Sequence, residues 1–257
     1  MSDLLVEKKD AVLMLTLNRP ESLNAFSEEM ILGLTNAFKL AQRDEEIRVV
    51  ILSGAGRSFS AGGDVKSMGT ASGEEVFEHL GHLNECILTM KQLEKPIIAA
   101  VHGFAAGAAF NLALACDLII AEENSQFVMS FAKVGLISDG GGLYFLPRIV
   151  GPYRAKELLF SAEPITAAKA YEYGLVNRVV SLENLKDEVV SFASAVAKGP
   201  IKAIGAMKKI IDHTASSTLE EVLEQERMMQ SLMVSTKDHQ EGVAAFKEKR
   251  LPAFQGK

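Results

Sequence analysis

The sequence predicts an α/β protein whose first half alternates strands and helices and whose C-terminal part is almost wholly helical. Short apolar runs bounded by turn signals alternate with segments whose apolar residues recur every three or four positions. This alternation favours right-handed βαβ units and a mostly parallel sheet. The chain has 257 residues, 48% of them hydrophobic, which suffices for one large domain or a domain with an appendage. We predict a core at 1–195 and a C-terminal helical region at 196–257.

The first elements are a strand and a capped helix. The segment "AVLMLTLNRP" is an apolar run that Pro20 ends, which indicates a strand within 11–20. Ser27 is then placed as the N-cap of a helix, because Glu28 and Glu29 follow in the first turn, where acidic side chains favour the positive end of the helix dipole.

Two further strands are each followed by a loop of small residues. "VVILSG" at 49–54 predicts a buried strand, and the glycine-rich "AGRSFSAGGD" follows it at 55–64. "IIAAVHG" at 97–103 predicts the next strand, and "GFAAGAAFNLALACD" at 103–117 opens a helix. Apolar residues spaced by three and four over 76–90 predict a long helix between the two strands.

Beyond the strand "LIIA" at 118–121, helices begin to dominate. One more helix is expected within 166–174 and one more strand within 174–180, and the chain is almost entirely helical from Leu182 onward. The segment 218–235 is too apolar for a solitary surface helix, with Leu219, Leu223, Met228, Met229, Leu232 and Met233 among its residues. We expect this face to pack on the chain's own core or on a neighbouring subunit.

Composition narrows the class of partner. The formal net charge of −6 and the pI near 5.5 argue against nucleic acid as the main partner and favour a small molecule. The two cysteines, Cys86 and Cys116, lie in apolar helical context and are expected to be buried, reduced thiols. No basic start precedes an apolar N-terminal run, and no apolar run reaches about 20 residues. We therefore expect a cytoplasmic protein without a membrane segment.

Several cofactor and nucleophile motifs do not occur. The chain has no G-x-G-x-x-G after its first strand, no phosphate-binding P-loop and no G-x-S-x-G elbow. Its five histidines form no H-E-x-x-H pattern. We expect a reaction that needs neither a metal site nor a redox cofactor.

Two loops and one carboxylate stand out as candidate chemistry. The small residues of 58–65 and 101–111 let backbone N–H groups approach a ligand closely, and two such groups from separate loops can form an oxyanion hole. Tight packing of helix on strand explains either loop taken alone. In "GLISDGGGLYFLPRIVG", Asp139 precedes three glycines within an apolar segment, where an unpaired carboxylate is costly. Its simplest structural role is to cap a helix that starts near Gly142.

The segments "SFSAGGDVKSM", "KPIIAAVHGFAAGAAFNLALACDLIIAEENSQF" and "VGLISDGGGLYFLPRIVG" resemble, in order, the signature segments of the enoyl-CoA hydratase/isomerase (crotonase) superfamily. The resemblance covers nearly the whole chain. It implies a crotonase-like spiral of β-β-α units, C-terminal helices that mediate trimers or hexamers, and acyl-CoA substrates, with coenzyme A as part of the substrate. It also implies an oxyanion hole at the amides of Gly63 and Ala108.

The departures from the family pattern point to one branch of it. The two glutamates with which the family's hydratases hold and activate water fall on Asn111 and Phe131, neither of which transfers a proton. Asp139 falls where those hydratases usually have glycine. The segment 127–151 resembles the isomerase branch, such as the ring 1,2-epoxyphenylacetyl-CoA isomerases, in which this aspartate moves the proton. An apolar pocket is expected to raise its pKa.

Substrate contacts are predicted at six positions, namely Ala61, Asp64, Lys66, Asn111, Phe131 and Gly140. Asp64 either braces its loop or lies beside the ribose, and Lys66 either meets CoA phosphates or stays solvated. Asn111 is a candidate to bind a substrate oxygen or a water.

The function predicted first is therefore an acyl-CoA isomerase that shifts a double bond, or rearranges a ring epoxide, by a proton shuttle at Asp139. An enoyl-CoA hydratase of fatty-acid or aromatic-acid breakdown is the nearest alternative. A non-catalytic acyl-CoA-binding member of the same fold is the second.

Overall fold

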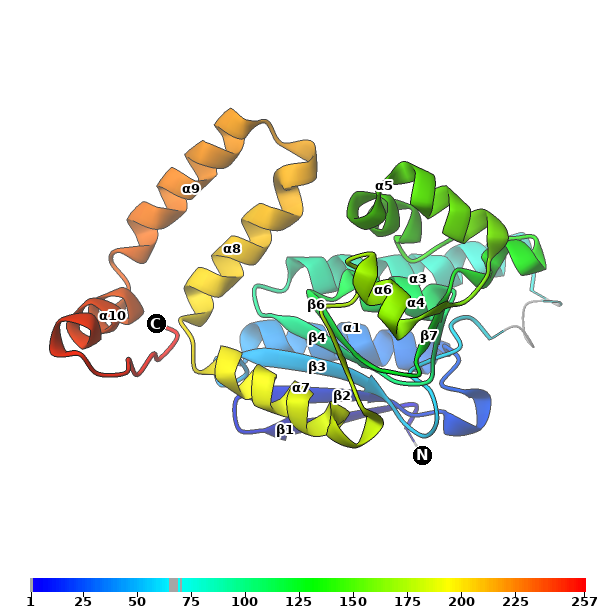
Figure 1. Cartoon of the computed structure of the whole chain (residues 1–257), viewed down its shortest axis with the longest axis horizontal. Helices are drawn as coiled ribbons and strands as arrows, with labels where there is room; N and C mark the ends of the chain where they lie inside the picture. Colours follow the sequence, from blue (N-terminus) through cyan, green and yellow to red (C-terminus); the bar gives the residue numbers. More distant parts are fainter. Residues whose placement is uncertain (1, 65–68, 70) are drawn as a thin grey trace.

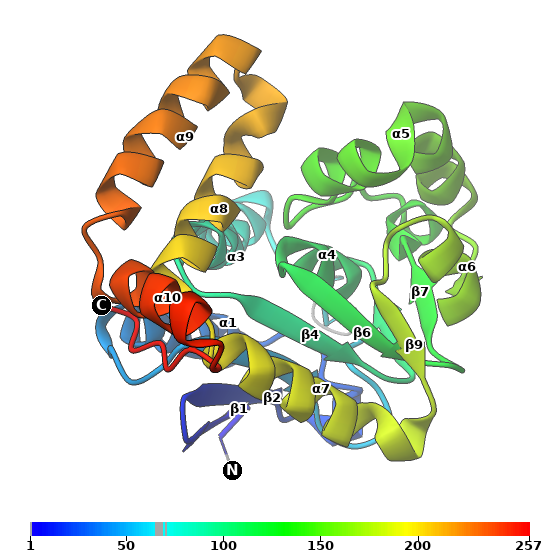
Figure 2. The same ribbon diagram turned by 60° about the vertical axis from the view of Figure 1, so that its left-hand side comes forward.

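The computed structural model describes residues 2–64, 69 and 71–257, and two views of it are given in Figures 1 and 2. Six strands form one sheet in the order β1-β2-β3-β4-β6-β9. Only β1 and β2 pair antiparallel, and the other neighbours are parallel. The strands are β1 Leu4–Lys9, β2 Val12–Leu17, β3 Val49–Gly54, β4 Ile97–Val101, β6 Leu118–Glu122 and β9 Arg178–Val180. The predicted mostly parallel sheet is confirmed.

Helices cover both faces of this sheet. On one face lie α1 (Glu28–Arg43), α3 (Gly73–Gln92) and α4 (Ala108–Ala115), and on the other lies α7 (Leu182–Ala197). A hydrophobic core lies on each face of the sheet. Alternate residues of a strand pack into one core or the other, because successive side chains of a strand point to opposite faces. In β3, Val50 and Leu52 belong to the first core, and Val49 and Ile51 to the core beneath α7. The predicted boundary after residue 195 falls inside α7.

The capped helix that the sequence predicts is present. The Ser27 hydroxyl accepts a hydrogen bond from the N–H of Met30 at 3.1 Å, and α1 begins at Glu28. Residues that were not assigned to strands form a second, three-stranded sheet in the order β5-β7-β8. Its strands are β5 Phe104–Ala106, β7 Gln126–Val128 and β8 Ile165–Thr166. β5 and β7 lie on either side of α4 in the chain, so this small sheet holds the loop before α4 in place.

Two helices lie between the second sheet's strands and β9. α5 (Gly142–Ser161) changes direction at Gly151, whose φ of +77° is not helical, and the short α6 (Ala167–Glu172) follows β8. A 3₁₀ turn, η2 (Ser130–Val134), leads from β7 into the segment before α5. Asp139 is therefore carried on the connection between η2 and α5.

The C-terminal region is helical, as predicted. α8 (Ile201–His213) and α9 (Leu219–Met233) run side by side and stand away from the sheet, and α10 (Lys237–Glu248) follows them. No residue of α9 is buried in the single chain. Large apolar side chains on these helices are exposed, among them Met207, Ile211, Leu219, Leu223, Met228, Leu232, Val243 and Phe246.

An ion-pair cluster joins α8 to the core. Lys208 of α8 lies 2.8 Å from a carboxylate oxygen of Asp117, the second residue beyond α4, and the Lys208 side chain is only 7% exposed. The same Asp117 oxygen accepts a hydrogen bond from the N–H of Ile97 in β4 at 2.7 Å. Lys91 of α3 lies 2.9 Å from Asp212 of α8. These contacts fix the second half of α8 against α3, β4 and the end of α4.

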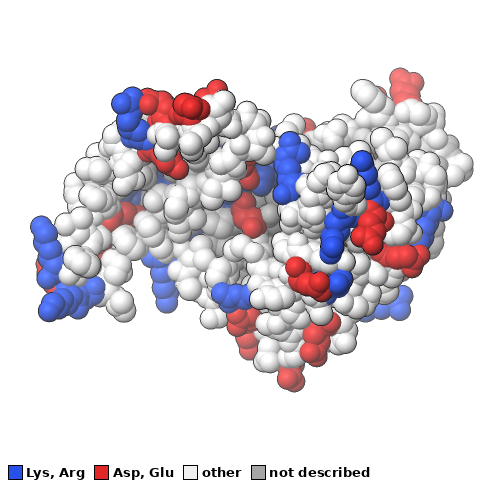
Figure 3. Space-filling model, turned by 45° about the horizontal axis from the view of Figure 1, so that its top comes forward, with Lys and Arg blue, Asp and Glu red and all other residues white. Residues whose placement is uncertain are grey.

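Surface charge and helix length add two observations. On the face shown in Figure 3, Lys and Arg side chains stand in small groups among Asp and Glu side chains and uncharged surface. Among the described helices, none is by itself long and apolar enough to cross a membrane. One pair, Leu182–Ala197 with Ile201–Ser216, passes that test only jointly and across a bend of 104°.

Candidate active site

The first loop follows β3 and presents Gly63. Gly62 has a φ of +82°, a conformation that side chains rarely adopt. Its N–H donates to the Ser60 hydroxyl at 3.0 Å, and that hydroxyl donates to the carbonyl of Asn24 at 2.7 Å. The carbonyl of Gly62 accepts from the N–H of Phe26 at 2.8 Å. These bonds fix both the N–H and the carbonyl of Gly62. They therefore also set the direction of the N–H of Gly63, which belongs to the following peptide group.

The second loop follows β5 and presents Ala108. Gly107, with a φ of +53° and a ψ of −123°, is the N-cap residue of α4, and Ala108 is the first helical residue. The N–H groups at the start of a helix have no partner within the helix. The loops touch, because a β-carbon built on Gly62 would lie 3.1 Å from the nitrogen of Ala108. Among the described residues, the backbone hydrogen bonds of turns, loops and caps include none donated by the N–H of Gly63 or of Ala108.

Asp139 lies on the connection that leads into α5. Gly140 and Gly141 follow it with φ values of +51° and +83°, which turn the chain sharply. Asp139 does not cap α5: Gly141 is the N-cap residue of this helix, and no side chain in the described part of the chain caps it. One carboxylate oxygen of Asp139 is buried and has no hydrogen-bond partner among the described residues.

Burial raises the pKa of Asp139 from 3.8 to about 6, the direction that the sequence predicts. The loss of hydration disfavours the charged form. A hydrogen bond from the residue's own backbone N–H acts in the opposite direction and offsets only part of this effect. A carboxyl with a pKa near 6 can both take up and release a proton near neutral pH.

Asn111 joins the second loop to Asp139. It lies one turn into α4 and is completely buried. Its side-chain amide donates to the Ser138 hydroxyl at 2.9 Å and to the backbone carbonyl of Asp139 at 2.8 Å. A β-carbon on Gly140 would lie 3.6 Å from that of Asn111. The helix that begins with Ala108 therefore directly contacts the segment that carries Asp139.

Phe131 also lies beside the second loop. It belongs to η2, is 8% exposed, and its ring edge would lie 3.7 Å from a β-carbon built on Gly107. The two positions at which the resemblance places the hydratase acids thus hold a buried amide, Asn111, and a buried ring, Phe131. Neither provides a carboxylate in this region.

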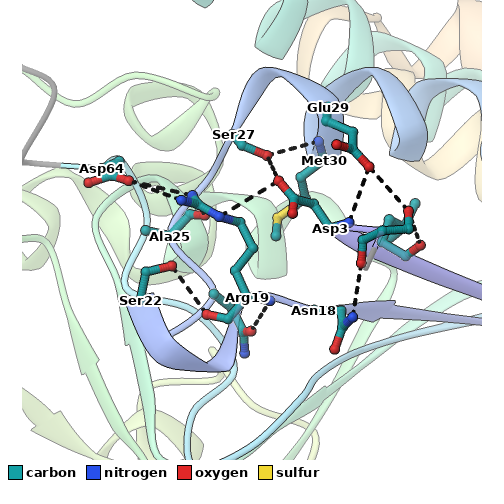
Figure 4. A network of polar contacts seen from close by, with 12 residues as sticks. Asp3, Asn18, Arg19, Ser22, Ala25, Ser27, Glu29, Met30 and Asp64 are labelled. Carbon is teal, nitrogen blue, oxygen red and sulfur yellow. Dashed lines mark hydrogen bonds and ion pairs between the residues drawn. The ribbon is translucent and has the colours of Figure 1, made fainter.

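Asp64 and Ala61 lie in the first loop, whereas Lys66 lies outside the described residues. Arg19 approaches a carboxylate oxygen of Asp64 at 3.4 Å and donates to the carbonyl of Ala25 at 2.8 Å (Figure 4). The N–H of Ala61 donates to the carbonyl of Leu23 at 2.8 Å. These contacts tie 61–64 to the segment after β2.

Sequence reasoning missed two polar residues that hold the site. Asn24 is fully buried with a φ of +56°, and its amide donates to the carbonyls of Ala55, Ser58 and Phe59. Ser138, directly before Asp139, is the partner of Asn111. An asparagine between Leu23 and Ala25 was the available signal for the first, because asparagine tolerates the left-handed conformation. No pattern marked Ser138.

Comparisons with known proteins cover the whole chain. A sequence model of the family described as enoyl-CoA hydratase/isomerase matches residues 7–257. The 1,2-epoxyphenylacetyl-CoA isomerase of Escherichia coli (strain K12) is 39% identical, with 100% of both chains covered. The 2,3-dehydroadipyl-CoA hydratase of the same organism is 34% identical, again over 100% of both chains.

The fold agrees with these sequence matches. The crystal structure of an enoyl-CoA hydratase from Bacillus anthracis superposes with a TM-score of 0.96 at 33% identity, covering 99% of this chain and 100% of that chain. The crotonase-like α/β fold with its C-terminal helical region is thereby confirmed. With nearly the whole chain matched in both sequence and fold, the protein belongs to the enoyl-CoA hydratase/isomerase family.

Proposed function

We propose that the protein is an acyl-CoA isomerase that moves a double bond, or rearranges a ring epoxide, in an enoyl-CoA-type thioester. The observation that carries this proposal is Asp139, which has one buried carboxylate oxygen without a hydrogen-bond partner among the described residues. Its main-chain carbonyl is bonded by Asn111, one turn from the amide of Ala108. A thioester carbonyl placed on the amides of Gly63 and Ala108 would have its α-carbon activated for proton loss.

The proposed double-bond shift needs one base. Ionised Asp139 removes a proton from C2 of a 3-enoyl thioester, and the electron pair moves onto the thioester oxygen to give a dienolate. The two amides stabilise the negative oxygen. The protonated carboxyl then returns the proton to C4, and the double bond ends between C2 and C3. A pKa near 6 suits this task, because the group must accept and release the same proton within one turnover.

Hydration is disfavoured by the residues that replace the hydratase acids. Adding water requires one group to activate the oxygen and another to protonate the α-carbon. Asn111 and Phe131 do neither, and Asn111 already uses its amide on Ser138 and Asp139. The name of the Escherichia coli relative that is 39% identical, an isomerase, supports the same choice.

Other properties follow from the same proposal. Coenzyme A would enter as part of the substrate, because it carries the acyl group. The proposed reaction therefore needs no permanently bound cofactor. Substrate contacts are proposed at Ala61, Asp64, Lys66 and Gly140, beside the residues already described. We also propose that the protein is cytoplasmic. We further propose that it forms a homotrimer or hexamer, since the C-terminal helices expose large apolar side chains.

The test is a comparison of wild type with Asp139→Asn on a panel of 2-enoyl, 3-enoyl and aromatic-ring CoA thioesters. Asparagine keeps the size of the side chain and cannot accept the proton. Isomerisation should fall by roughly a hundredfold or more, with little change in thioester affinity. Asp187→Asn, an exposed change on α7, is the matched control and should behave as wild type. Wild-type turnover in Asp139→Asn, or a wild type that only hydrates 2-enoyl thioesters, contradicts the proposal.

A further inference from the structure

Asn111 is a buried amide whose hydrogen-bonding capacity is only half used. Its Nδ2 donates to the Ser138 hydroxyl at 2.9 Å and to the main-chain oxygen of Asp139 at 2.8 Å. Its Oδ1 is buried and has no partner among the described residues. A buried amide oxygen without a donor costs free energy. The two hydrogen bonds that Nδ2 donates are therefore kept even though they leave Oδ1 without a donor, which costs free energy.

The main-chain oxygen of Asp139 fixes the orientation of this amide. A carbonyl only accepts hydrogen bonds, so the NH₂ group of Asn111 must face it. Turning the amide over would place Oδ1 against the carbonyl oxygen, and both groups are acceptors. Only one orientation satisfies the backbone of Asp139, and it is the one that leaves Oδ1 unpaired.

The glycines after Asp139 fit closely around this amide. A β-carbon on Gly142 would lie 2.3 Å from Oδ1 and 2.5 Å from Nδ2 of Asn111, and 2.3 Å from the Ser138 hydroxyl oxygen. A β-carbon on Gly140 would lie 3.6 Å from that of Asn111 and 3.5 Å from Leu83. The turn 138–142 is therefore seated on Asn111 with no room for a side chain at Gly142.

We propose that Asn111 is a positioning residue for the isomerisation: by bonding the main chain at Asp139, it sets where the carboxylate stands relative to the amide of Ala108. The proposal rests on the proposed function, in which Asp139 transfers the proton. Ala108 and Asn111 lie within one turn of the same buried helix, so the amide that receives the thioester oxygen and the segment that carries the base share one rigid element. Proton transfer depends steeply on such placement.

The side-chain type matters as much as its size. A carboxylate at this position has no donor for the Asp139 carbonyl and would add a second negative charge beside the base. An apolar residue of equal size has no donor either. An amide is the uncharged group of this length that can donate to the hydroxyl of Ser138 and the carbonyl of Asp139 together.

The experiment compares Asn111→Asp and Asn111→Ala with wild type. Asn184→Ala is the matched control, because the Asn184 amide also donates to a serine hydroxyl, that of Ser181 at 2.8 Å, but at an exposed site on α7. We would measure kcat and KM for a 3-enoyl-CoA thioester against pH. We would also follow the carboxyl ¹³C signal of Asp139 through a pH titration, which needs no turnover.

The positioning role predicts a loss confined to kcat. Both variants should lose at least about tenfold in kcat and keep KM within about twofold. In Asn111→Asp, the added carboxylate should move the Asp139 titration and the acidic limb of the kcat profile to higher pH. Asn111→Ala adds no charge and should lower kcat without that displacement. Asn184→Ala should match wild type in every measurement.

Three results would overturn the proposal. The first is wild-type kcat, within about twofold, in a folded Asn111→Asp or Asn111→Ala protein. The second is an Asp139 signal that titrates identically in wild type and Asn111→Asp. The third is a failure of both variants to fold, because it would assign Asn111 to overall stability. If Asp139→Asn itself keeps wild-type turnover, the proposed function fails first, so the two failures are distinguishable.

Discussion

Gly62 packs against Ala106 so closely that a β-carbon on Gly62 would lie 2.3 Å from the Ala106 carbonyl oxygen. Because the same β-carbon would lie 3.1 Å from the nitrogen of Ala108, this contact sets the separation of the two loops that present the amides of Gly63 and Ala108. A backbone with a φ of +82° at this point is one that glycine adopts without strain.

Gly62→Ala is expected to force the two loops apart. The added methyl group has a backbone oxygen in its way and an unfavourable φ, so the free energy of unfolding should fall by about 1–3 kcal/mol. Isomerisation should weaken more than this loss of folded protein explains. Gly81→Ala lies in the exposed middle of α3, where an added β-carbon would have no described atom from outside its own helical segment within 4 Å. This change should be neutral or stabilising. Equal behaviour of the two variants in denaturant melts and turnover would contradict the assignment.

The pH dependence of the reaction should report Asp139. Its carboxyl must be ionised to accept a proton, and burial raises its pKa to about 6. The value of kcat/KM is therefore expected to rise with pH up to about 6 and to level off above it. An acidic limb centred near pH 4 would contradict the burial of this group in solution.

The stability of the fold should depend on the same carboxyl. Its pKa is higher in the folded chain than its ordinary value of 3.8, so ionising it destabilises the fold. This cost is absent below about pH 4, grows between about pH 4 and 6, and is complete above about pH 6. Asp139→Asn should therefore be more stable than wild type at pH 7.5, by about 1–2 kcal/mol after allowance for partial solvent screening. Melting curves of both proteins should converge at pH 4.

Ala108→Pro should remove one of the two proposed amide donors. Ala108 is the first helical residue of α4, where proline is tolerated because its missing N–H has no helical partner. Turnover should fall roughly a hundredfold, the weight of one oxyanion-hole donor, or about 3 kcal/mol. Leu182→Pro places proline at the same position of α7 and should leave turnover unchanged. A folded Ala108→Pro protein with full turnover would refute the role given to this amide.

The exposed face of α9 should bind further copies of the chain. Leu223 and Leu232 are 53% and 56% exposed in the single chain, more apolar surface than a helix leaves in water. Light scattering should give three or six times the chain mass of 27.8 kDa. Replacing both leucines with glutamate should lower the measured mass, whereas Leu40→Glu on α1 should not. A wild-type mass of one chain at micromolar concentration would rule this out.

The sequence predicted the elements that have a strong local pattern. Ser27 with Glu28 and Glu29 marked the start of α1, and "VVILSG" coincides with β3 at Val49–Gly54. β1 and the small sheet β5-β7-β8 were missed. β1 exposes all but one of its residues, and the others have two or three residues each, so neither alternation nor length distinguishes them from loops.

The candidate site was predictable only in part. Gly63, Ala108 and Asp139 were identified by their positions in the segments that resemble the family's signature segments. The apolar residues around Asp139 in the sequence correctly indicated that its pKa is raised. The pairing of Asn111 with Ser138 and the Asp139 carbonyl was not predictable, because it joins residues 27 and 28 positions apart through a turn whose path depends on tertiary packing. The same holds for Asn24, whose three backbone acceptors lie more than 30 residues away.

The ion pair between Lys208 and Asp117 connects α8 to the end of α4. α4 has eight residues, so about 12 Å of helix separates its two ends. Ala108 begins this helix, Asp117 lies just beyond its far end, and Lys208 belongs to the helical hairpin that projects from the core. The helix therefore connects the amide proposed to bind the thioester oxygen, at one end, with the projecting hairpin, at the other. A displacement of Lys208 would therefore act on Asp117, and through it on the helix whose first residue is Ala108.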